Sequence, residues 1–375
     1  MNLLPPKLRV IISGGGTGGH IFPAIAIANA LKKLNPETEI LFVGATGRME
    51  MEKVPAAGYK IEGLNISGIQ RKLSFKNLFI PFKVFQSIMK SRRIIKAFSP
   101  DVVIGVGGYA SGPLLYAATA MHIPALIQEQ NSFAGITNKI LAKRVQKICV
   151  AYEGMEKFFP KNKIIITGNP VREETTRIAG KRTEAANFFG IDPHKKTILV
   201  IGGSLGARTI NESIGNSIAE FKKNDFQLIW QTGKSFSEKA VQLIDQLEYK
   251  GVLTYQFIQR MDYAYAAADV IISRAGASSV SELALVAKPV ILVPSPNVAE
   301  DHQTQNAMAL VNKGAAILIK DSEAQSTLIS SVINLLKDEN YQRSLSEKIK
   351  TLAIGDSSER IASEVYKLVK NIDLK

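Results

Sequence analysis

The pattern of apolar and polar positions divides the chain into two segments that begin in the same way. Residues 8–12 (LRVII) and 197–201 (TILVI) are continuous apolar runs, and each leads into a glycine turn and then into an amphipathic pattern of helical period. Continuous β-branched runs are typical of parallel strands that helices cover on both faces. We expect those helices over residues 21–34 and 208–221. The pattern therefore predicts the strand, turn and helix that start a doubly wound sheet, twice in one chain.

Further apolar runs extend both sheets. They lie at residues 39–43, 102–106 and 125–128 in the first half, and at residues 269–273 and 290–294 in the second. The stretches between them can hold the crossover helices that parallel pairing requires. We therefore predict an α/β protein with two Rossmann-like, doubly wound parallel-sheet domains that face a cleft.

The expected hinge between these domains is the tripeptide at residues 168–170 (GNP), because proline restricts the residue before it and ends regular pairing. One domain then covers residues 1–170 and the other residues 171–356. Two domains suit a chain of 375 residues, since a single core seldom organises more than about 250 to 300. Residues 359–370 carry the pattern of a final helix.

The composition of the chain narrows the class of protein. The one cysteine, Cys149, lies in an apolar run, so the chain alone forms neither a disulfide nor a cysteine zinc cluster, and a reducing cytoplasm fits best. The first residues do not have the pattern of a secretory signal, and no run of about 18 apolar residues predicts a membrane-spanning helix. The formal net charge of +14 favours anionic partners such as phosphorylated substrates, anionic lipid or nucleic acid.

Part of that charge lies in residues 63–100, which contain no acidic residue. Aromatic and aliphatic side chains recur there at helical spacing, with Pro81 as an expected kink or break. The residues predicted to contact anionic lipid are Phe75, Leu78, Phe79, Phe82, Lys83, Phe85, Lys90, Arg92 and Arg93. The alternative is that the aromatic residues belong to the core and the basic residues to a solvated face. No RNA-binding signature accompanies the charge, so we expect no nucleic-acid partner.

The first glycine turn, at residues 14–19 (GGGTGG), places backbone N–H groups at a helix start, which favours phosphate binding. A nicotinamide site would add an acidic residue at the end of the second strand, but residues 41–46 (LFVGAT) contain none, which disfavours a dehydrogenase. His20 follows the turn directly. If His20 faces a cleft, its neutral imidazole can accept a proton, whereas a ring that faces inward only caps or packs.

The second glycine turn, at residues 202–206 (GGSLG), matches the nucleophile elbow of serine hydrolases. His302 lies late enough in the chain to complete a triad, so a hydrolase that uses Ser204 and His302 remains an alternative. Ser204 can instead donate to a phosphate at a helix start. The duplicated turn favours the phosphate, because a hydrolase has one sheet and leaves the first turn unexplained.

A third glycine-containing turn occupies residues 274–282 (RAGASSVSE). Ser279 and Glu282 fit a capping box, but the carboxylate of Glu282 can also accept hydrogen bonds from both hydroxyls of a ribose. Two polar clusters follow other strands, at residues 105–113 (GVGGYASGP) and 128–131 (QEQN), and Asn and Gln amides suit sugar hydroxyls. The sequence contains no D-x-D pair and no His/Cys ligand cluster, so it does not require a metal.

These motifs together resemble those of the bacterial cell-wall glycosyltransferases of family 28. The resemblance runs nearly end to end and depends on seven segments in the same order, at residues 14–20, 105–113, 128–131, 168–172, 202–207, 274–282 and 301–307. It implies the two-domain GT-B fold and an inverting transfer of N-acetylglucosamine (GlcNAc) from UDP-GlcNAc. The implied acceptor is undecaprenyl-pyrophosphoryl-MurNAc-pentapeptide (lipid I), which becomes lipid II on glycosylation of its 4-hydroxyl. No cofactor is required, and the enzyme would be peripheral, on anionic lipid at the cytoplasmic face of the inner membrane.

The resemblance also implies roles for single residues, with His20 as the catalytic base. The implied UDP-GlcNAc-binding residues are Thr17, Gly18, Gly19, Asn131, Arg172, Ser204, Ile258, Ala277, Ser278, Ser279, Val280, Ser281, Glu282 and Gln303. The implied acceptor-diphosphate residues are Gly15, Gly16, Gly107, Gly108 and Tyr109. Glu282 would hold the ribose, Ile258 would meet uracil through its backbone, and the final helix, within residues 357–375, would fold back onto the first domain.

Two positions depart from the family pattern, since Gln128 and His302 stand where relatives often have His and Gln. These departures leave the donor unchanged but bear on individual sugar contacts. A non-enzymatic membrane-surface or nucleotide-binding protein is the further alternative, and such a protein would bind ligand without forming product.

Overall fold

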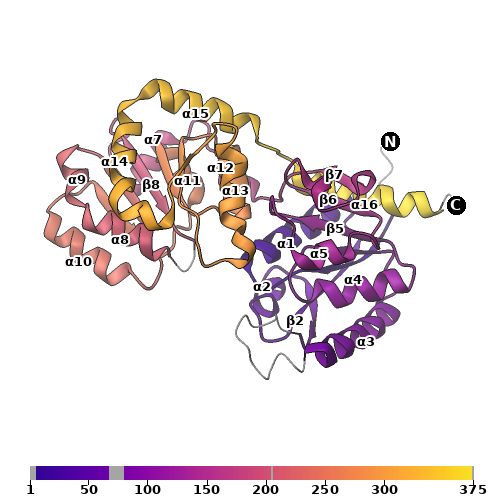
Figure 1. The fold of residues 1–375 in the computed structure, drawn as a ribbon. Coiled ribbons are helices and arrows are strands. Elements are labelled where there is room, and N and C mark those ends of the chain that lie inside the picture. The colour runs from indigo at the N-terminus through magenta and orange to yellow at the C-terminus, as the bar shows by residue number, and fades with distance from the viewer. Residues whose placement is uncertain (1–5, 67–79, 204–205, 374–375) are drawn as a thin grey trace. The chain divides into compact units, whose positions relative to one another are not determined.

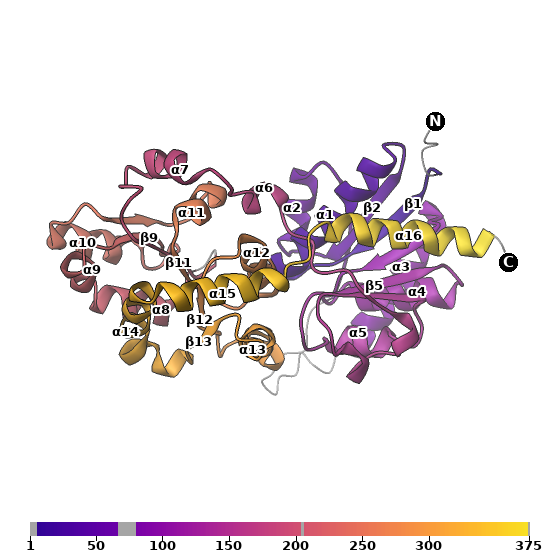
Figure 2. The same cartoon turned by 90° about the horizontal axis from the view of Figure 1, so that it is seen from above.

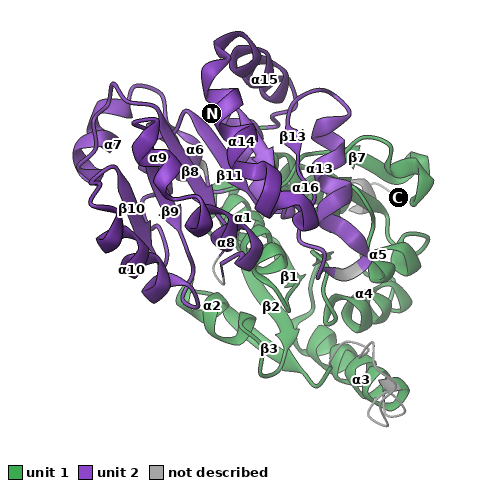
Figure 3. Ribbon diagram, turned by 60° about the vertical axis from the view of Figure 1, so that its left-hand side comes forward, with its two compact units in different colours: residues 1–171, 355–375 green, residues 172–354 purple. Residues whose placement is uncertain are grey.

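The computed structural model describes residues 6–66, 80–203 and 206–373, which form two compact units (Figures 1 and 3). Unit 1 comprises Met1–Val171 together with Gly355–Lys375, and unit 2 comprises Arg172–Ile354. The chain thus passes from one unit to the other just after the tripeptide at residues 168–170, and its last helix belongs to the first unit.

Unit 1 contains a seven-stranded parallel sheet with the order β3-β2-β1-β4-β5-β6-β7. Its strands are β1 (Arg9–Ser13), β2 (Glu39–Ala45), β3 (Lys60–Leu64), β4 (Val102–Gly105), β5 (Ala125–Glu129), β6 (Lys147–Val150) and β7 (Ile164–Ile166). The first strand pairs with β2 on one side and β4 on the other, with Ser13 opposite Gly105 at the carboxyl end. The strand order reverses between β1 and β4, and open α/β sheets bind ligands at such a point.

Helices cover both faces of this sheet. They are α1 (Gly18–Leu34), α2 (Glu50–Ala56), α3 (Ile80–Phe98), α4 (Ser111–Ala120), α5 (Ile136–Leu141) and α16 (Ser357–Asp373), with short 3₁₀ turns η2 (Met155–Lys157) and η3 (Lys161–Lys163). The last helix lies against α1, as Figure 2 shows, and buries Ile361 and Val365 in the same apolar cluster as Ile27 and Leu31. Helices α3 and α4 pack on the opposite face.

Unit 2 contains a six-stranded parallel sheet with the order β10-β9-β8-β11-β12-β13. Its strands are β8 (Thr197–Ile201), β9 (Gln227–Gln231), β10 (Val252–Tyr255), β11 (Val270–Ser273), β12 (Val290–Leu292) and β13 (Ile317–Leu318). Its helices are α6 (Glu173–Thr176), α7 (Arg182–Phe189), α8 (Arg208–Asn216), α9 (Ala219–Lys223), α10 (Ser237–Leu247), α11 (Met261–Ala267), α12 (Ala277–Val286), α13 (His302–Val311), α14 (Ala324–Lys337) and α15 (Glu339–Thr351), with 3₁₀ turns η4 (Ala299–Asp301) and η5 (Asp321–Glu323). The largest side chain of its core is Trp230, which is fully buried.

The two sheets confirm the predicted α/β class with two Rossmann-like parallel sheets. One detail of the prediction is wrong. The expected helix over residues 208–221 is two helices, α8 and α9, because the chain leaves helical geometry at Ser217. Pro81, the expected kink or break, is the second residue of α3, in the first turn, where a missing N–H costs no helical hydrogen bond.

Candidate active site

The first glycine turn connects β1 to α1 at the switch point of unit 1. The backbones of two glycine loops touch there, because a Cβ on Gly108 would overlap the backbone of Gly15, and Gly108 also has a positive φ of 85°. Only glycine combines this φ with such a close approach. The structure thus brings together the residues expected at the acceptor diphosphate, Gly15 and Gly16 from one loop and Gly107 and Gly108 from the other. Tyr109 follows them and is half exposed.

A buried carboxylate that sequence reasoning missed supports this turn. Glu50, the first residue of α2, is fully buried. Its Oε1 accepts a hydrogen bond from the Ala45 N–H at 3.0 Å, and its Oε2 accepts one from the Gly16 N–H at 3.0 Å. A Cβ on Gly15 would overlap the Glu50 carboxylate. In the sequence, Glu50 looks like an ordinary acidic residue at a helix start, so no signal marked it.

His20 lies in the first turn of α1 and is partly exposed. Its Nδ1 is 3.2 Å from the carbonyl oxygen of Gly15 and 3.2 Å from Oγ1 of Thr17. A carbonyl oxygen only accepts, so Nδ1 carries the hydrogen, and in the neutral ring the lone pair lies on Nε2. A Cβ on Gly107 would be 2.9 Å from that Nε2. The ring is thus partly exposed, and its basic nitrogen lies beside the second glycine loop.

The polar cluster at residues 128–131 divides into interior and surface residues. Gln128 and Gln130 are buried, and Gln128 donates to Oδ1 of Asn169 at 3.0 Å. Gln130 donates to the Val106 carbonyl at 2.8 Å and to the side chain of Gln128, while Asn169 donates to the Gln130 carbonyl at 2.9 Å. The amides of both glutamines thus tie the segment at residues 168–170 to the sheet edge.

Asn131, by contrast, is partly exposed and is held by a second buried carboxylate, Glu129. One oxygen of Glu129 accepts from the Asn131 N–H at 3.0 Å and from its Nδ2 at 3.2 Å. The other accepts from the Gly135 N–H at 3.1 Å and from Nδ2 of Asn138 at 2.8 Å. Glu129 therefore fixes both the loop and the side-chain amide of Asn131.

In unit 2, Ser204 of the second glycine turn lies outside the described residues, but the start of the turn is described. Gln231, at the end of β9, donates to the Gly203 carbonyl at 3.1 Å and accepts from the Ile258 N–H at 3.1 Å. The same amide thus joins the glycine turn to the segment expected at uracil. The Ile258 N–H is occupied, while its carbonyl oxygen accepts no hydrogen bond from the residues that the structure describes.

The third turn leads into α12, which begins at Ala277 with Gly276 as its N-cap. Ser279 therefore lies inside the first turn, and the capping box with Glu282 does not form, because the helix begins too early for it. Glu282 instead accepts a hydrogen bond from the Tyr265 hydroxyl at 3.2 Å. Burial raises the pKa of the Glu282 carboxyl, although the charge of Arg172 and the Tyr265 bond oppose that rise.

The residues of α12 that are expected to bind the donor differ in their exposure to solvent. Ala277, Ser278, Ser279 and Ser281 are partly exposed, and the Ser281 hydroxyl donates to the Ala277 carbonyl at 3.2 Å. Val280 is buried, and its N–H donates to the Gly276 carbonyl at 2.9 Å.

Arg172 is exposed and lines a pocket of about 570 Å³ in unit 2. Its other lining residues are Glu174, Thr175, Arg177, Lys181, Gln259, Arg260, Met261 and Asp262. Asp262 is bound by Arg260 through two hydrogen bonds of 2.9 Å and by Lys181 at 3.0 Å, which lowers the pKa of its carboxyl. Because Arg172 also acts on Glu282 electrostatically, this cationic pocket adjoins the expected ribose site.

Gln303, His302 and Arg274 contact other residues of unit 2. Gln303, in the first turn of α13, accepts from the Ser295 N–H at 2.9 Å, and Nε2 of His302 lies 3.6 Å from the Glu300 carboxylate. Arg274 donates to the carbonyls of Val293 and Pro294 at 3.0 and 3.1 Å, and forms an ion pair with Asp321. The guanidinium of Arg274 is thus an internal support of the strand ends.

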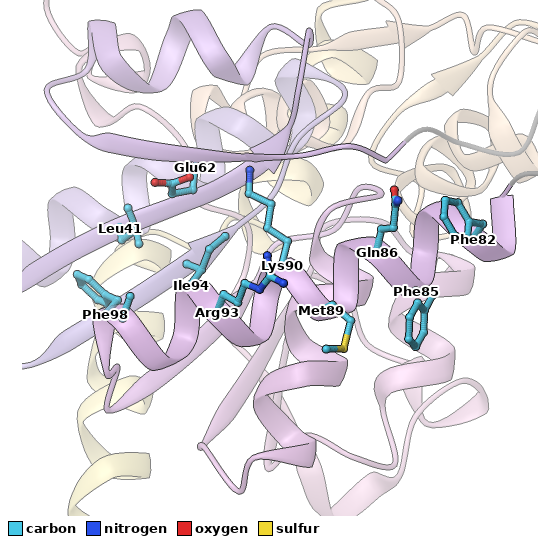
Figure 4. A pocket seen from close by; sticks show the side chains of 11 residues that line it. Leu41, Glu62, Phe82, Phe85, Gln86, Met89, Lys90, Arg93, Ile94 and Phe98 are labelled. Atoms are coloured by element: carbon cyan, nitrogen blue, oxygen red, sulfur yellow. The ribbon is translucent and has the colours of Figure 1, made fainter.

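Helix α3 carries some of the residues that are expected to contact lipid. Phe82 and Phe85 are 60% and 61% exposed, so the alternative that these aromatic residues belong to the core is wrong. They line a groove of about 920 Å³ with Met89, Lys90 and Arg93 (Figure 4). Lys90 donates to the Gly63 carbonyl at 2.6 Å. Phe75, Leu78 and Phe79 lie outside the described residues.

Membrane spans were sought among the helices of the described ranges, 6–66, 80–203 and 206–373. None of these helices is both long enough and apolar enough to cross a bilayer.

Two doubly wound sheets, each with a glycine turn at its switch point, define a GT-B type of nucleotide-sugar enzyme. Residues 10–150 match the N-terminal domain of glycosyltransferase family 28, and residues 197–362 match the C-terminal domain of the same family. The chain therefore belongs to glycosyltransferase family 28. This membership gives the serine hydrolase alternative no support.

Curated relatives extend over nearly the whole chain. A protein of Parabacteroides distasonis is 56% identical over 363 residues, covering 97% of this chain and 99% of the relative, and a protein of Bacteroides thetaiotaomicron is 55% identical over 97% and 98%. Both are named UDP-N-acetylglucosamine–N-acetylmuramyl-(pentapeptide) pyrophosphoryl-undecaprenol N-acetylglucosamine transferase. The crystal structure of MurG from Acinetobacter baumannii is similar with a TM-score of 0.80 at 27% identity, covering 96% of this chain and 100% of that one.

Proposed function

We propose that this enzyme transfers GlcNAc from UDP-GlcNAc to the 4-hydroxyl of MurNAc in undecaprenyl-pyrophosphoryl-MurNAc-pentapeptide, forming lipid II for peptidoglycan synthesis. The observation that carries the proposal is the 56% identity with a transferase of that name over nearly the full length of both chains. The placement of His20 beside two contacting glycine loops supports it, because this reaction needs a base near an acceptor diphosphate.

His20 acts as the catalytic base in this proposal. Nε2 of its neutral ring takes the proton of the 4-hydroxyl as that oxygen attacks the anomeric carbon of GlcNAc. The bond between that carbon and the UDP oxygen breaks on the opposite face, so the configuration inverts and UDP leaves with the bonding electrons. The glycine loops that carry Gly15, Gly16, Gly107 and Gly108 receive the acceptor diphosphate, with Tyr109 at their edge.

The donor binds mainly to unit 2 in this proposal. Ionised Glu282 accepts hydrogen bonds from the ribose hydroxyls, and the Ile258 carbonyl accepts one from the uracil N3–H. The charge of Arg172 and a hydrogen bond from Ser204 stabilise the diphosphate and the departing UDP without a metal cofactor. The start of α12 and Gln303 complete the donor site on unit 2. Unit 1 contributes Thr17, Gly18, Gly19 and Asn131.

The enzyme works as a peripheral protein at the cytoplasmic face of the inner membrane in this proposal. The exposed Phe82 and Phe85 enter the lipid interface while Lys83, Arg92 and Arg93 attract anionic headgroups. This orientation suits an acceptor whose polyprenyl chain stays in the bilayer.

Calorimetric titration with UDP-GlcNAc, UDP-glucose, UDP-GalNAc and NAD tests the donor. We expect preference for UDP-GlcNAc and no binding of NAD. Incubation with UDP-GlcNAc and a short-chain lipid I analogue should then yield the disaccharide product with inverted configuration. Binding without product would instead indicate a nucleotide-binding protein, and the absence of any uridine-nucleotide binding would overturn the transferase.

A further inference from the structure

One peptide group of the first glycine turn connects Glu50 to His20. The N–H of Gly16 and the C=O of Gly15 belong to the same planar amide and point in opposite directions. The N–H donates to Oε2 of Glu50 at 3.0 Å, and the C=O accepts from Nδ1 of His20 at 3.2 Å. A buried carboxylate, one amide and the imidazole therefore form a continuous chain of hydrogen bonds.

We propose that Glu50 is a positioning residue for the transfer reaction, because it orients the Gly15–Gly16 peptide group so that its carbonyl holds the hydrogen of His20 on Nδ1 and leaves the lone pair on Nε2. This inference rests on the proposed role of His20 as the base. The role is that of a carboxylate which orients a catalytic imidazole and selects its tautomer, here through an intervening amide.

The chain geometry shows why such an orienting group is needed. Both rotations that turn this peptide group belong to glycines, and glycine resists rotation less than any other residue. Gly16 has a φ of 85°, and among the residues that the structure describes a Cβ there would meet no atom within 4 Å apart from its chain neighbours. The Glu50 carboxylate lies directly against Gly15 on the inner side.

The position of Glu50 is itself rigid. It is fully buried, and its other oxygen is held by the Ala45 N–H at the end of β2, at 3.0 Å. A Cβ on Gly44 would approach Cγ of Glu50 to 2.6 Å, so the side chain fills a channel between β2 and the glycine turn. The sheet thus fixes the position of the Glu50 carboxylate, the carboxylate fixes the orientation of the amide, and the amide fixes the tautomer of the imidazole.

The first variant is Glu50→Gln, in which one of the two N–H donors faces an NH₂ group instead of an oxygen. We expect kcat to fall about tenfold or more while KM for UDP-GlcNAc stays within about twofold. In ¹⁵N-histidine spectra of the unliganded enzyme above the imidazole titration, wild-type His20 should show a hydrogen on Nδ1. The variant should shift toward the Nε2–H tautomer. The His20 signal is assigned by its absence in His20→Gln, since the chain has four histidines.

Glu52→Gln is the matched control, because Glu52 lies two residues along the same helix with a largely exposed side chain. It should leave both kcat and the His20 spectrum unchanged. Should Glu50→Gln fail to fold, Glu50→Asp keeps the buried charge with a side chain one methylene shorter. That shorter carboxylate cannot reach both N–H groups, so we expect the same loss of kcat and the same tautomer shift.

The outcomes separate this inference from the proposed function. A folded Glu50 variant with wild-type kcat and an Nδ1–H signal overturns the positioning role, even if His20→Ala abolishes turnover. If His20→Ala instead retains turnover, His20 is not the base, and the tautomer shift alone then shows that Glu50 orients the ring without a catalytic consequence, which also overturns the inference.

Discussion

The two units share a strand order around their first strand, but they support their ligand loops with side chains of opposite charge. Unit 1 places the carboxylates of Glu50 and Glu129 behind its loops, and both accept only from N–H groups of the chain. Unit 2 places the guanidinium of Arg274 behind its strand ends and exposes Arg172 in a cationic pocket. The same fold thus places cationic side chains at the strand ends and in a pocket of unit 2, whereas in unit 1 buried carboxylates accept hydrogen bonds from loop amides.

This difference suits two ligands that bind for different reasons. In the proposed function a soluble nucleotide sugar is attracted by charge, which the cationic pocket lined by Arg172 would supply. An acceptor held in the bilayer by its lipid is already concentrated at the surface. Unit 1 can therefore tolerate buried anions near a diphosphate site, because the orientation of the base matters more there than electrostatic attraction of the acceptor.

The largest expected effect is on the base of unit 1. His20→Ala should lower kcat by about 10²-fold or more, because proton removal from the 4-hydroxyl is lost, while the affinity for UDP-GlcNAc changes little. Steady-state kinetics and donor calorimetry measure the two quantities. His194→Ala, in an exposed position of unit 2, is the control and should behave as wild type. Near-normal turnover of His20→Ala would remove His20 from the mechanism.

The next largest effect should be on the membrane binding that we propose for α3 of unit 1. Replacing both Arg92 and Arg93 by Gln should weaken sedimentation with anionic vesicles about 30-fold, since each basic residue near the surface contributes about 1 kcal/mol. Both are exposed on α3. The control is the double change of Lys234 and Lys250 to Gln, which removes the same charge from exposed positions of unit 2. Equal losses in the two variants would mean that net charge, not α3, drives binding.

A third effect concerns the ribose site of unit 2. Glu282→Gln should weaken UDP-GlcNAc binding about tenfold, because a hydrogen bond to a charged acceptor is lost, while kcat at saturating donor stays near the wild-type value. A 2′-deoxyuridine donor should bind the wild type more weakly and lose little further affinity in the variant. If the variant weakens both donors equally, Glu282 does not contact the ribose. Glu238→Gln, on α10, controls for the change of charge.

Sequence patterns predicted the parallel strands next to each glycine turn, because buried parallel strands are unbroken apolar runs. They missed six of the strands that the structure describes, and two of these, β3 (KIEGL) and β10 (VLTY), are short edge strands with partly exposed residues. The break between α8 and α9 was equally hidden, since helical periodicity continues across it.

The sequence predicted some parts of the candidate site and missed others, for a related reason. Glycine turns and His20 are local motifs, so sequence places them together. Glu50 and Gln231 act across 34 and 27 residues through tertiary contacts that no spacing reveals. The capping box expected for Ser279 and Glu282 is wrong. Residues 279–282 have the pattern of a helix start, but the helix begins earlier, at Ala277.

The smallest effect, and the one that separates binding from stability, is the pH dependence of Glu282. Burial raises the pKa of this carboxyl above that of an ordinary glutamate, against the opposing effect of Arg172 and the Tyr265 hydroxyl. The ionised form accepts both ribose hydroxyls, so the affinity for UDP should fall with decreasing pH sooner than an ordinary glutamate would allow. Calorimetry of UDP binding between pH 7.5 and about pH 5 measures this, and Glu282→Gln should flatten the profile.

The same shift has the opposite sign for folding. A carboxyl whose pKa is higher in the folded than in the unfolded chain makes the folded state bind its proton more tightly, so stability falls as pH rises through that window. Glu282 therefore lowers the stability of the free enzyme at neutral pH, and Glu282→Gln should raise its thermal midpoint there while weakening the donor. A variant that is both less stable and weaker at neutral pH would instead assign Glu282 to the structure of unit 2, and the charge contrast between the two units would then not extend to the ribose site.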